Sequence, residues 1–294
     1  MNGPINIPSS GKRRYGKLLM ILGVVVLVIA GVIGSQLPAI GAGLILHPFR
    51  RPVLASPPLE CRSVTLQGEG VTLHGWRGEA VGSRRGTLIY LHGVADNRAS
   101  GAGVMERFRK RGFDVIAYDS RAHGESGGDA CTFGFFEKED LRRVLDTAGP
   151  GPVVLIGSSL GAAVALQLAA AEPRISAVVA AESFSDLRTV ASDRAPFFFT
   201  SGMVERAFEI AEQNGRFQIG AASPLVAAKQ IKAPVLLIHG AIDTDTRPDH
   251  ARRIFAALAG PKHLMLVPDA GHNQSLQGNV WGGIERWIDS VLSP

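Results

Sequence analysis

The sequence predicts an α/β fold in which helices cover both faces of a mostly parallel β-sheet. Short, continuously apolar runs alternate with stretches of helical spacing from about residue 61 to the end of the chain. Such runs are typical of parallel strands, because helical crossovers bury both faces of a parallel sheet. A chain of 294 residues, of which 46% are hydrophobic, is also long and apolar enough for one large domain.

Each element has its own pattern. Residues 63–79 are predicted to form a pair of strands that turn around Gly68 and Gly70. The later strands are the apolar runs at 86–93, 113–120, 152–159, 175–183, 233–240 and 262–269. Helices are expected at 99–112, 137–149, 160–173, 248–260 and 279–292. The stretch from about 184 to 232 interrupts the alternation, so we expect a helical cap inserted between two strands.

An apolar segment near the N-terminus predicts a membrane anchor. Residues 18–34 are all apolar or glycine, and a transmembrane helix needs about 17–25 such residues. The expected organisation is a cytoplasmic basic tail at 1–17, a transmembrane helix at 18–38, a linker at 39–60 and a globular domain at 61–294. The alternative is a cleaved signal peptide with a weak cleavage site at 38–43, which would leave the domain secreted.

The placement of charge predicts the orientation and excludes one class of partner. The formal net charge is +5, but residues 1–51 carry six basic residues and no acid, so the rest of the chain sums to −1. Those six are Lys12, Arg13, Arg14, Lys17, Arg50 and Arg51. Basic residues beside a transmembrane helix stay on the cytoplasmic side, which places the domain outside, in the periplasm or the extracellular space. No basic stripe is interleaved with aromatic residues, so we expect no nucleic-acid binding.

The two cysteines leave their redox state open. Cys61 and Cys131 are compatible either with one disulfide or with two buried thiols. The sequence has no CxxC motif and no Cys/His cluster, so no metal site is expected.

Two adjacent serines lie between glycines where a predicted strand meets a predicted helix. Gly157, Ser159 and Gly161 fit the pattern G-x-S-x-G, whereas Ser158 would be flanked by isoleucine and leucine instead. Glycines at these positions let the backbone pass close to itself in a sharp strand-to-helix turn. The central serine then lies exposed at the helix N-terminus, so Ser159 is the predicted nucleophile.

A serine hydroxyl needs a base, and the base needs an acid that orients it. His272 follows the last predicted strand and is the predicted base, with His123 in a glycine-rich turn as its chief competitor. Asp243, nearer than Asp245 to the end of the preceding strand, is the predicted acid. The chain order serine, aspartate, histidine is that of one convergent triad family.

An acyl-transfer site also needs N–H donors for the developing oxyanion. One donor is expected at Leu160, directly after the serine. The other is expected at Val94, in the loop after the strand at 86–93.

Six blocks of sequence, in this order, resemble those of α/β-hydrolase fold proteins. They are "LIYLHGVADN", "YDSRAHGESGG", "FGFFEKEDLRRVLD", "LIGSSLGAAVAL", "LLIHGAIDTDTRP" and "PDAGHN". In detail they are similar to bacterial membrane-anchored hydrolases of the YqkD-like and serine aminopeptidase S33 types. The resemblance covers about residues 61–294 and implies an α/β-hydrolase fold and a serine hydrolase that requires no metal or organic cofactor. It implies Ser159 as nucleophile, His272 as base, Asp243 as acid, and Val94 with Leu160 as oxyanion donors.

The predicted reaction is cleavage of a carboxylic ester, or an amide, through an acyl-enzyme. In such folds the insertion after the sixth strand forms a lid, so the three phenylalanines at 197–199 are candidates for an acyl pocket. Packing of the cap onto the core, or contact with the membrane, explains these residues equally well. The expected partners are a small-molecule or lipid-like acyl substrate and, through the N-terminal helix, a membrane.

Three alternatives remain for the function. An aminopeptidase would need an acidic pocket in the cap, where Glu205, Glu209 and Glu212 occur, but their helical spacing favours a solvated face. A thioesterase or an acyltransferase would use the same triad. A non-catalytic membrane-anchored binding module would have no need of all three triad residues.

Overall fold

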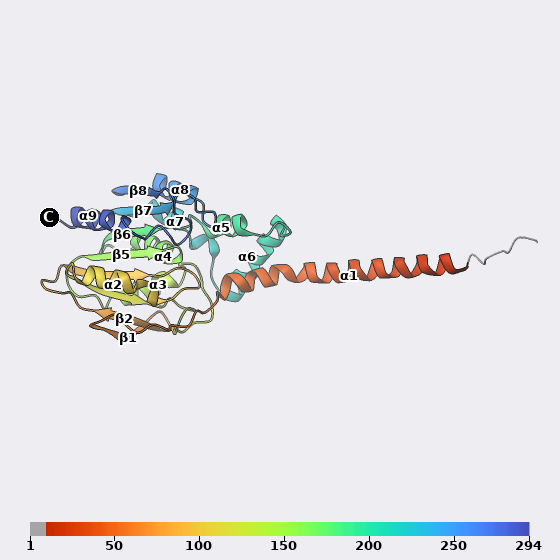
Figure 1. The fold of residues 1–294 in the computed structure, drawn as a ribbon, viewed down its shortest axis with the longest axis horizontal. Coiled ribbons are helices and arrows are strands. Elements are labelled where there is room, and N and C mark those ends of the chain that lie inside the picture. The colour runs from red at the N-terminus through yellow and green to blue at the C-terminus, as the bar shows by residue number, and fades with distance from the viewer. Residues whose placement is uncertain (1–9, 294) are drawn as a thin grey trace, which may run out of the picture.

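A computed structural model of the protein describes residues 10–293, so residues 1–9 of the predicted basic tail lie outside the described part. The described chain forms an eight-stranded sheet flanked by helices, with one long helix extending away from it (Figure 1). The strands are β1 (Cys61–Gln67), β2 (Thr72–Gly78), β3 (Gly86–Leu91), β4 (Phe113–Tyr118), β5 (Val153–Ser158), β6 (Ile175–Ala181), β7 (Val235–Gly240) and β8 (Lys262–Val267). The α-helices are α1 (Ser10–Leu46), α2 (Ala102–Arg109), α3 (Glu137–Leu145), α4 (Leu160–Ala169), α5 (Leu187–Arg194), α6 (Ser201–Gly215), α7 (Pro224–Ala228), α8 (Asp249–Ala257) and α9 (Val280–Leu292).

The sheet topology opens a crevice at one edge of the sheet. The strand order is β1-β2-β4-β3-β5-β6-β7-β8, and all pairs are parallel except β1 with β2 and β2 with β4. Because β4 and β5 lie on opposite sides of β3, the order of the strands reverses at this point. The loops after neighbouring strands then leave toward opposite faces and form a ligand crevice at their carboxyl ends. The loops after β3 and β5 carry Val94 and Ser159 to this edge.

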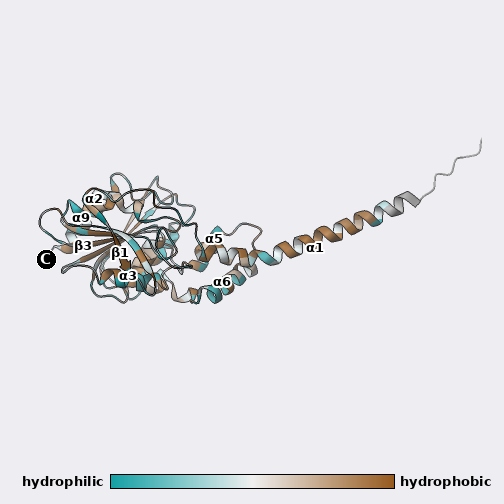
Figure 2. Cartoon of the chain, turned by 90° about the horizontal axis from the view of Figure 1, so that it is seen from below, coloured by the Kyte–Doolittle hydropathy of each residue, from teal (hydrophilic) through white to brown (hydrophobic). Residues whose placement is uncertain are grey.

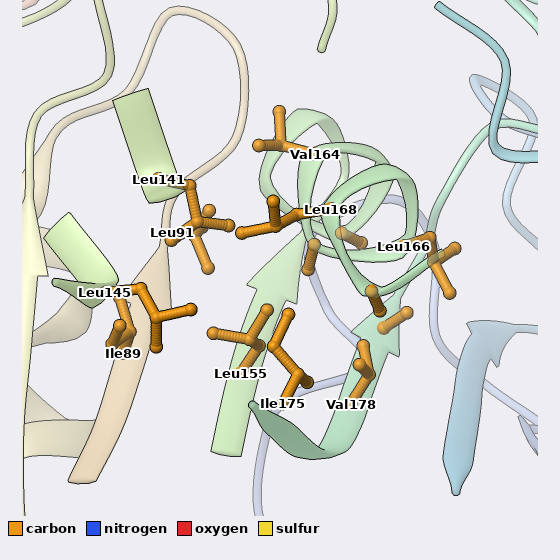
Figure 3. Close-up of a cluster of buried hydrophobic side chains, with 14 of the residues drawn as sticks. Ile89, Leu91, Leu141, Leu145, Leu155, Val164, Leu166, Leu168, Ile175 and Val178 are labelled. Atoms are coloured by element: carbon orange, nitrogen blue, oxygen red, sulfur yellow. The ribbon is translucent and has the colours of Figure 1, made fainter. Parts of the chain in front are cut away.

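Apolar side chains fill both faces of the sheet, as the continuous apolar runs predict. On one face, Leu141 of α3 and Leu168 of α4 belong to one buried cluster with Leu91 of β3 and Leu155 of β5 (Figure 3). On the opposite face, α2 and α9 cover the sheet with a second buried cluster that includes Phe108 and Ile284. The mostly parallel sheet flanked by helices is therefore confirmed.

The segment between β6 and β7 forms a cap on this core. It contains α5, α6 and α7, together with a short 3-10 helix at Ile219–Ala221. Leu187 of α5 and Phe208 of α6 belong to a third buried cluster, which also includes Ala163 of α4 and Leu46 of α1. The cap thus packs against two other parts of the chain, the first turn of α4 and the end of α1.

Helix α1 is 37 residues long and extends away from the domain on the side of the cap (Figure 1). Figure 2 shows it hydrophobic over most of its length. Side chains such as Leu18, Leu27 and Ile33 are more than half exposed. The part Tyr15–Leu46 is long and apolar enough to cross a membrane, and its position near the N-terminus suits either an anchor or a signal sequence.

The helix continues past the end of the predicted anchor. Residues 39–46, expected as the start of the linker, extend it through Pro38. A proline inside a helix removes one backbone hydrogen bond and favours a break. Here the last turns pack against α6, which leaves Ala42 and Leu46 each 1% exposed. Tertiary burial of this kind stabilises a helix more than its own propensity does.

The rest of the linker lies against the domain. The side-chain amide of Asn97 donates to the carbonyl of Arg51 at 3.2 Å. The guanidinium of Arg50 donates to the carbonyl of Ser126 at 2.5 Å. Hydrogen bonds therefore hold residues after α1 in place.

The two cysteines are free thiols. Cys61 begins β1 and is partly exposed, whereas Cys131 is buried in the loop after β4. Burial raises the pKa of the Cys131 thiol well above its usual value. Of the two options left open by the sequence, the structure has two thiols.

Candidate active site

Ser159 lies in a strained turn between β5 and α4. Its backbone has φ +50° and ψ −110°, a conformation that non-glycine residues rarely adopt. A Cβ atom at Gly157 would lie 2.4 Å from the Gly161 backbone, and one at Gly161 would lie 2.2 Å from the Leu91 carbonyl oxygen. Both glycines of the motif are therefore required by close backbone approach, for the reason that the sequence pattern predicts.

The adjacent serines occupy different surroundings. Ser158 is the last residue of β5 and lines a partly polar cavity on the side of Glu182 and Asn273. Ser159 lines an apolar cavity beneath the cap. The imidazole Nε2 of His272 lies 3.2 Å from the Ser159 hydroxyl oxygen. Ser159 is thus the serine that the structure brings to the predicted base.

Three residues from separate loops form one hydrogen-bonded chain. His272 follows β8, and its Nδ1–H donates to Asp243 Oδ2 at 2.7 Å. Asp243 follows β7, and its side chain is fully buried. Since Nδ1 carries the proton in this arrangement, Nε2 is free to accept a proton from the Ser159 hydroxyl.

The Asp243 carboxylate is held by donors on both oxygens. Oδ1 accepts from the backbone N–H groups of Asp245 at 2.9 Å and Thr246 at 2.8 Å. Oδ2 accepts from His272 and lies 3.4 Å from Nε2 of the buried His239. Burial alone would raise the pKa of this carboxyl, but the hydrogen bonds from His239, His272 and Thr246 outweigh burial and hold the pKa well below its usual value.

The competing residues have other roles. Asp245 is exposed and contributes its backbone N–H to Asp243 rather than its carboxylate. His123 is fully buried, and its Nδ1 hydrogen-bonds the Arg121 carbonyl at 2.8 Å. Burial, and then the neighbouring His92, lower the pKa of His123 to about 4. Neither competitor is hydrogen-bonded to Ser159 among the described residues.

Glu182 is a site residue that the sequence reading missed. It directly follows β6, is 1% exposed and has a positive φ of 56°. Its carboxylate accepts the backbone N–H groups of Asn273 at 2.7 Å, Gln274 at 3.0 Å and Ser275 at 2.9 Å. These three residues follow His272, so Glu182 fixes the loop that carries the imidazole. The available signal was an acidic residue at the end of the apolar run "AVVAAES".

The residues expected to donate to an oxyanion lie beside the serine. Leu160 is the first residue of α4, and Val94 lies in the loop after β3. Both line the cavity that contains Ser159. The N-terminus of α4 also places the positive end of a helix dipole at this point, which favours a negatively charged oxygen.

An apolar cavity of about 350 Å³ extends from Ser159 beneath the cap. This volume is within the range of ligand pockets, roughly 300–1,000 Å³. Among the described residues that line it, only Ser159 and Arg194 have polar side chains. The Arg194 guanidinium is itself bonded to the Asp245 carbonyl at 2.7 Å and to the Thr246 hydroxyl at 2.8 Å. The other side chains that line the cavity are all hydrocarbon.

The phenylalanines of the cap divide between the cavity and the surface. Phe199 lines the cavity. Phe197 is 99% exposed and Phe198 is 52% exposed. One of the three thus lies where an acyl pocket was expected, and two lie on the outside.

The acidic residues of the cap do not line the cavity. Glu205 pairs with Arg188, and Glu209 pairs with Arg206 at 2.7 Å. Glu212 accepts the backbone N–H of Ile219 at 2.9 Å. Within residues 10–293, no three His, Cys, Asp or Glu side chains are grouped so that they would hold a metal ion.

Known proteins resemble this chain in sequence and in fold. The profile of the alpha/beta hydrolase fold family matches residues 86–212. Protein YqkD of Bacillus subtilis is 30% identical over 203 residues, covering 66% of this chain and 67% of that protein. Protein YfhR of Escherichia coli (strain K12) is 26% identical over 299 residues, covering 96% of each chain.

Two solved structures show the same architecture. The Pyrococcus furiosus esterase Pf2001 has a TM-score of 0.66 and 27% identity, covering 84% of this chain and 96% of the esterase. The Pyrococcus horikoshii acylaminoacyl peptidase has a TM-score of 0.64 and 16% identity, covering 79% of this chain and 41% of the peptidase. At that identity the peptidase shows the fold alone. Family profile, sequence relatives and fold agree, and the chain belongs to the α/β-hydrolase fold family.

Proposed function

We propose that the protein is a serine hydrolase that cleaves carboxylic esters through an acyl-enzyme. One observation carries the proposal: the His272 imidazole hydrogen-bonds Asp243 with one nitrogen and Ser159 with the other. A serine, a histidine and a buried carboxylate in this order of contacts form the arrangement that activates a serine hydroxyl.

The geometry supports two half-reactions. As the Ser159 oxygen attacks the ester carbonyl, Nε2 of His272 takes the hydroxyl proton, and Asp243 stabilises the imidazolium. The carbonyl oxygen gains negative charge, and we propose that the backbone N–H groups of Val94 and Leu160, which line the same cavity as Ser159, donate hydrogen bonds to it. Collapse breaks the ester bond, and the imidazolium returns its proton to the leaving alcohol. Water, deprotonated by His272, then attacks the acyl-serine ester. As the ester bond breaks, the imidazolium returns the proton to the Ser159 oxygen and a carboxylic acid is released.

An ester with an apolar acyl group fits the cavity better than a peptide with a free amine. An ammonium group needs a carboxylate partner, and the carboxylates of Glu205, Glu209 and Glu212 are bonded elsewhere on the cap. The lining beside Ser159 is hydrocarbon apart from Arg194, which carries the same charge as an amine. The similarity to the Pyrococcus furiosus esterase supports the same choice.

The proposal places the protein on a membrane, with α1 as an uncleaved anchor and the domain on the outer side. Cleavage at 38–43 would remove or shorten the turns that pack on the cap, including the buried Ala42. Retention of α1 keeps this cluster intact. The basic residues before the helix favour a cytoplasmic N-terminus.

The test is hydrolysis of p-nitrophenyl esters, from acetate to palmitate, by the full chain in detergent micelles. Ser159→Ala is expected to lower the rate to background, because loss of the nucleophile from such a triad costs about 10⁶-fold in kcat. Ser158→Ala is the matched control and is expected to keep most of the activity. A fluorophosphonate probe should label the wild type and Ser158→Ala, but not Ser159→Ala. Unchanged turnover in Ser159→Ala, or an unlabelled but folded wild type, would contradict the proposal.

A further inference from the structure

The end of the apolar helix α1 forms part of the wall of the cavity beside Ser159. Gly41, Leu44 and Ile45 line this cavity together with residues of α5 and α6. They come from the turns that follow the predicted transmembrane segment 18–38. With a rise of about 1.5 Å per residue, Gly41 lies only about 5 Å along the helix from Pro38. The cavity therefore begins where the membrane-spanning part of the helix would end.

The contact between α1 and the cap is close and extended. A Cβ atom at Gly41 would lie 3.3 Å from both the Phe199 ring and the Ala207 side chain. Farther along, the Leu46 carbonyl accepts the backbone N–H of Cys131 at 2.8 Å, which ties the end of α1 to the core. The end of α1 is thus packed against the cap and hydrogen-bonded to the core of the domain.

The cavity reaches the surface between α1 and the loop that joins α5 to α6. Leu44 and Pro196 line the cavity, yet both are exposed, Leu44 by 73%. The same loop carries the exposed Phe197 and Phe198. Figure 1 shows that the connection between α5 and α6 lies on the side of the domain from which α1 extends. Exposed aromatic side chains beside a membrane helix are typical of the bilayer interface.

We propose that α1 is both the anchor and a wall of the acyl site, and that the substrate is a long-chain acyl ester resident in the membrane. Its acyl chain enters from the bilayer between α1 and the α5–α6 loop, with Phe197 and Phe198 inserted in the interface. An apolar wall continuous with an apolar helix lets the chain pass to Ser159 without exposure to water. This inference rests on the proposed function, because the ester must reach an active Ser159.

The first experiment uses two glycine-to-leucine variants of α1 in the full chain, reconstituted in phosphatidylcholine vesicles. Gly41→Leu places a side chain against Phe199 and Ala207 at the cavity wall, whereas Gly43→Leu makes the same change two residues away, where nothing lies within 4 Å. Gly41→Leu is expected to lower kcat/KM for p-nitrophenyl palmitate by about 10-fold or more, since loss of space for even one methylene costs this much. The ratio of palmitate to acetate cleavage is therefore expected to fall in Gly41→Leu, whereas Gly43→Leu should leave this ratio and both activities unchanged.

The outcomes separate this inference from the proposed function. Equal loss on acetate and palmitate in Gly41→Leu, or no loss on either, would overturn the role of α1 in the acyl site. A wild type that cleaves acetate but not palmitate, with dependence on Ser159, would overturn the long-chain substrate and leave the hydrolase intact. A wild type without Ser159-dependent cleavage of any ester would remove the proposed function and this inference together.

The second experiment tests the entry side independently of activity. In vesicles that contain brominated phospholipid, a tryptophan inserted in the interface loses fluorescence, whereas one in water does not. The full chain with Phe197→Trp is expected to show clear additional quenching relative to wild type. Val81→Trp, at another exposed apolar position in the loop before β3, should show none. Equal quenching at both positions, or none at Phe197→Trp, would overturn the interfacial contact.

Discussion

Ser159 separates two halves of the site that are built on different principles. On one side, Asp243, His272 and Glu182 are fixed by hydrogen bonds of 2.7–3.0 Å from three separate loops. On the other side, α1, α5 and α6 enclose a cavity with an apolar lining, in which packing alone sets the shape. The difference suggests a division of labour in which the polar half determines the rate and the apolar half determines which acyl chain is accepted. Changes in the polar half should therefore slow all esters equally, and changes in the apolar half should alter chain-length preference.

The largest effect is expected from the acid of the polar half. Asp243→Asn should lower kcat by about 10⁴-fold for short and long esters alike, because the amide no longer holds the imidazole in the required tautomer. Asp245→Asn is the control and should have little effect, since Asp245 forms its hydrogen bonds through its backbone N–H and carbonyl and not through its carboxylate. Steady-state kinetics on p-nitrophenyl acetate and palmitate measures both. The reverse order of the two variants would reassign the acid.

A smaller loss is expected at Glu182, which positions the histidine loop. Glu182→Gln keeps one acceptor oxygen but loses the negative charge of the carboxylate, which strengthens its hydrogen bonds from three N–H groups. We expect kcat to fall by about 10- to 100-fold on every ester, with KM little changed, because misplacement of a catalytic group by a short distance has this cost.

The split between kcat and KM distinguishes positioning from general damage to the fold. Labelling by a fluorophosphonate should slow in parallel with kcat, while the melting temperature of Glu182→Gln identifies any loss of folded protein. A normal labelling rate, or a loss confined to palmitate, would place Glu182 outside the polar half.

His123 is a buried polar residue that does not belong to the polar half of the site. Its pKa is lowered to about 4, so the folded state favours the neutral ring. The unfolded chain binds a proton below about pH 6.5, so this residue's stabilising contribution is complete above that pH and is lost as the pH falls toward 4. At pH 5 the loss is about 2 kcal/mol.

His123→Gln should reduce the difference in unfolding free energy between pH 7 and pH 5, measured by denaturant titration in detergent. The esterase activity at pH 7 should remain, since His123 has no hydrogen bond to the triad among the described residues. Loss of ester cleavage in a folded His123→Gln protein would restore it as a candidate base.

The smallest effect on ester cleavage is expected from enlarging the apolar half. Leu187 lines the cavity and is 3% exposed, whereas Leu168 of α4 is also buried but packs into the core away from the cavity. Truncation of either to alanine should cost about 2–5 kcal/mol in stability. Leu187→Ala should raise the ratio of palmitate to acetate cleavage several-fold, and Leu168→Ala should leave this ratio unchanged. Similar ratios for both variants would show that the cavity does not select the chain.

The two halves also differ in how far the sequence predicts them. The sheet, its flanking helices and the loops that carry Ser159, Asp243 and His272 follow from local patterns, because a strained turn needs glycines and buried strands need apolar runs. The role of Glu182 could not be predicted from the sequence, because a carboxylate that accepts hydrogen bonds from N–H groups far away in the chain has no local sequence pattern. The helix at residues 39–46 could not be predicted for the same reason. It depends on contact with α6, whereas the local sequence, with Pro38, favours a break in the helix.

The continuity of α1 with the cap has a kinetic consequence. The helix runs unbroken through Pro38 into contacts with α6, and hydrogen bonds then hold Arg50 and Arg51 against the domain. If α1 is the proposed anchor, only a short, rigid connection joins the bilayer to the proposed active site. An enzyme held in this way samples substrate by lateral diffusion in two dimensions. Its rate would follow the mole fraction of substrate among the surrounding lipids, so diluting the vesicles in buffer would leave turnover unchanged, whereas diluting the substrate with inert lipid would lower it.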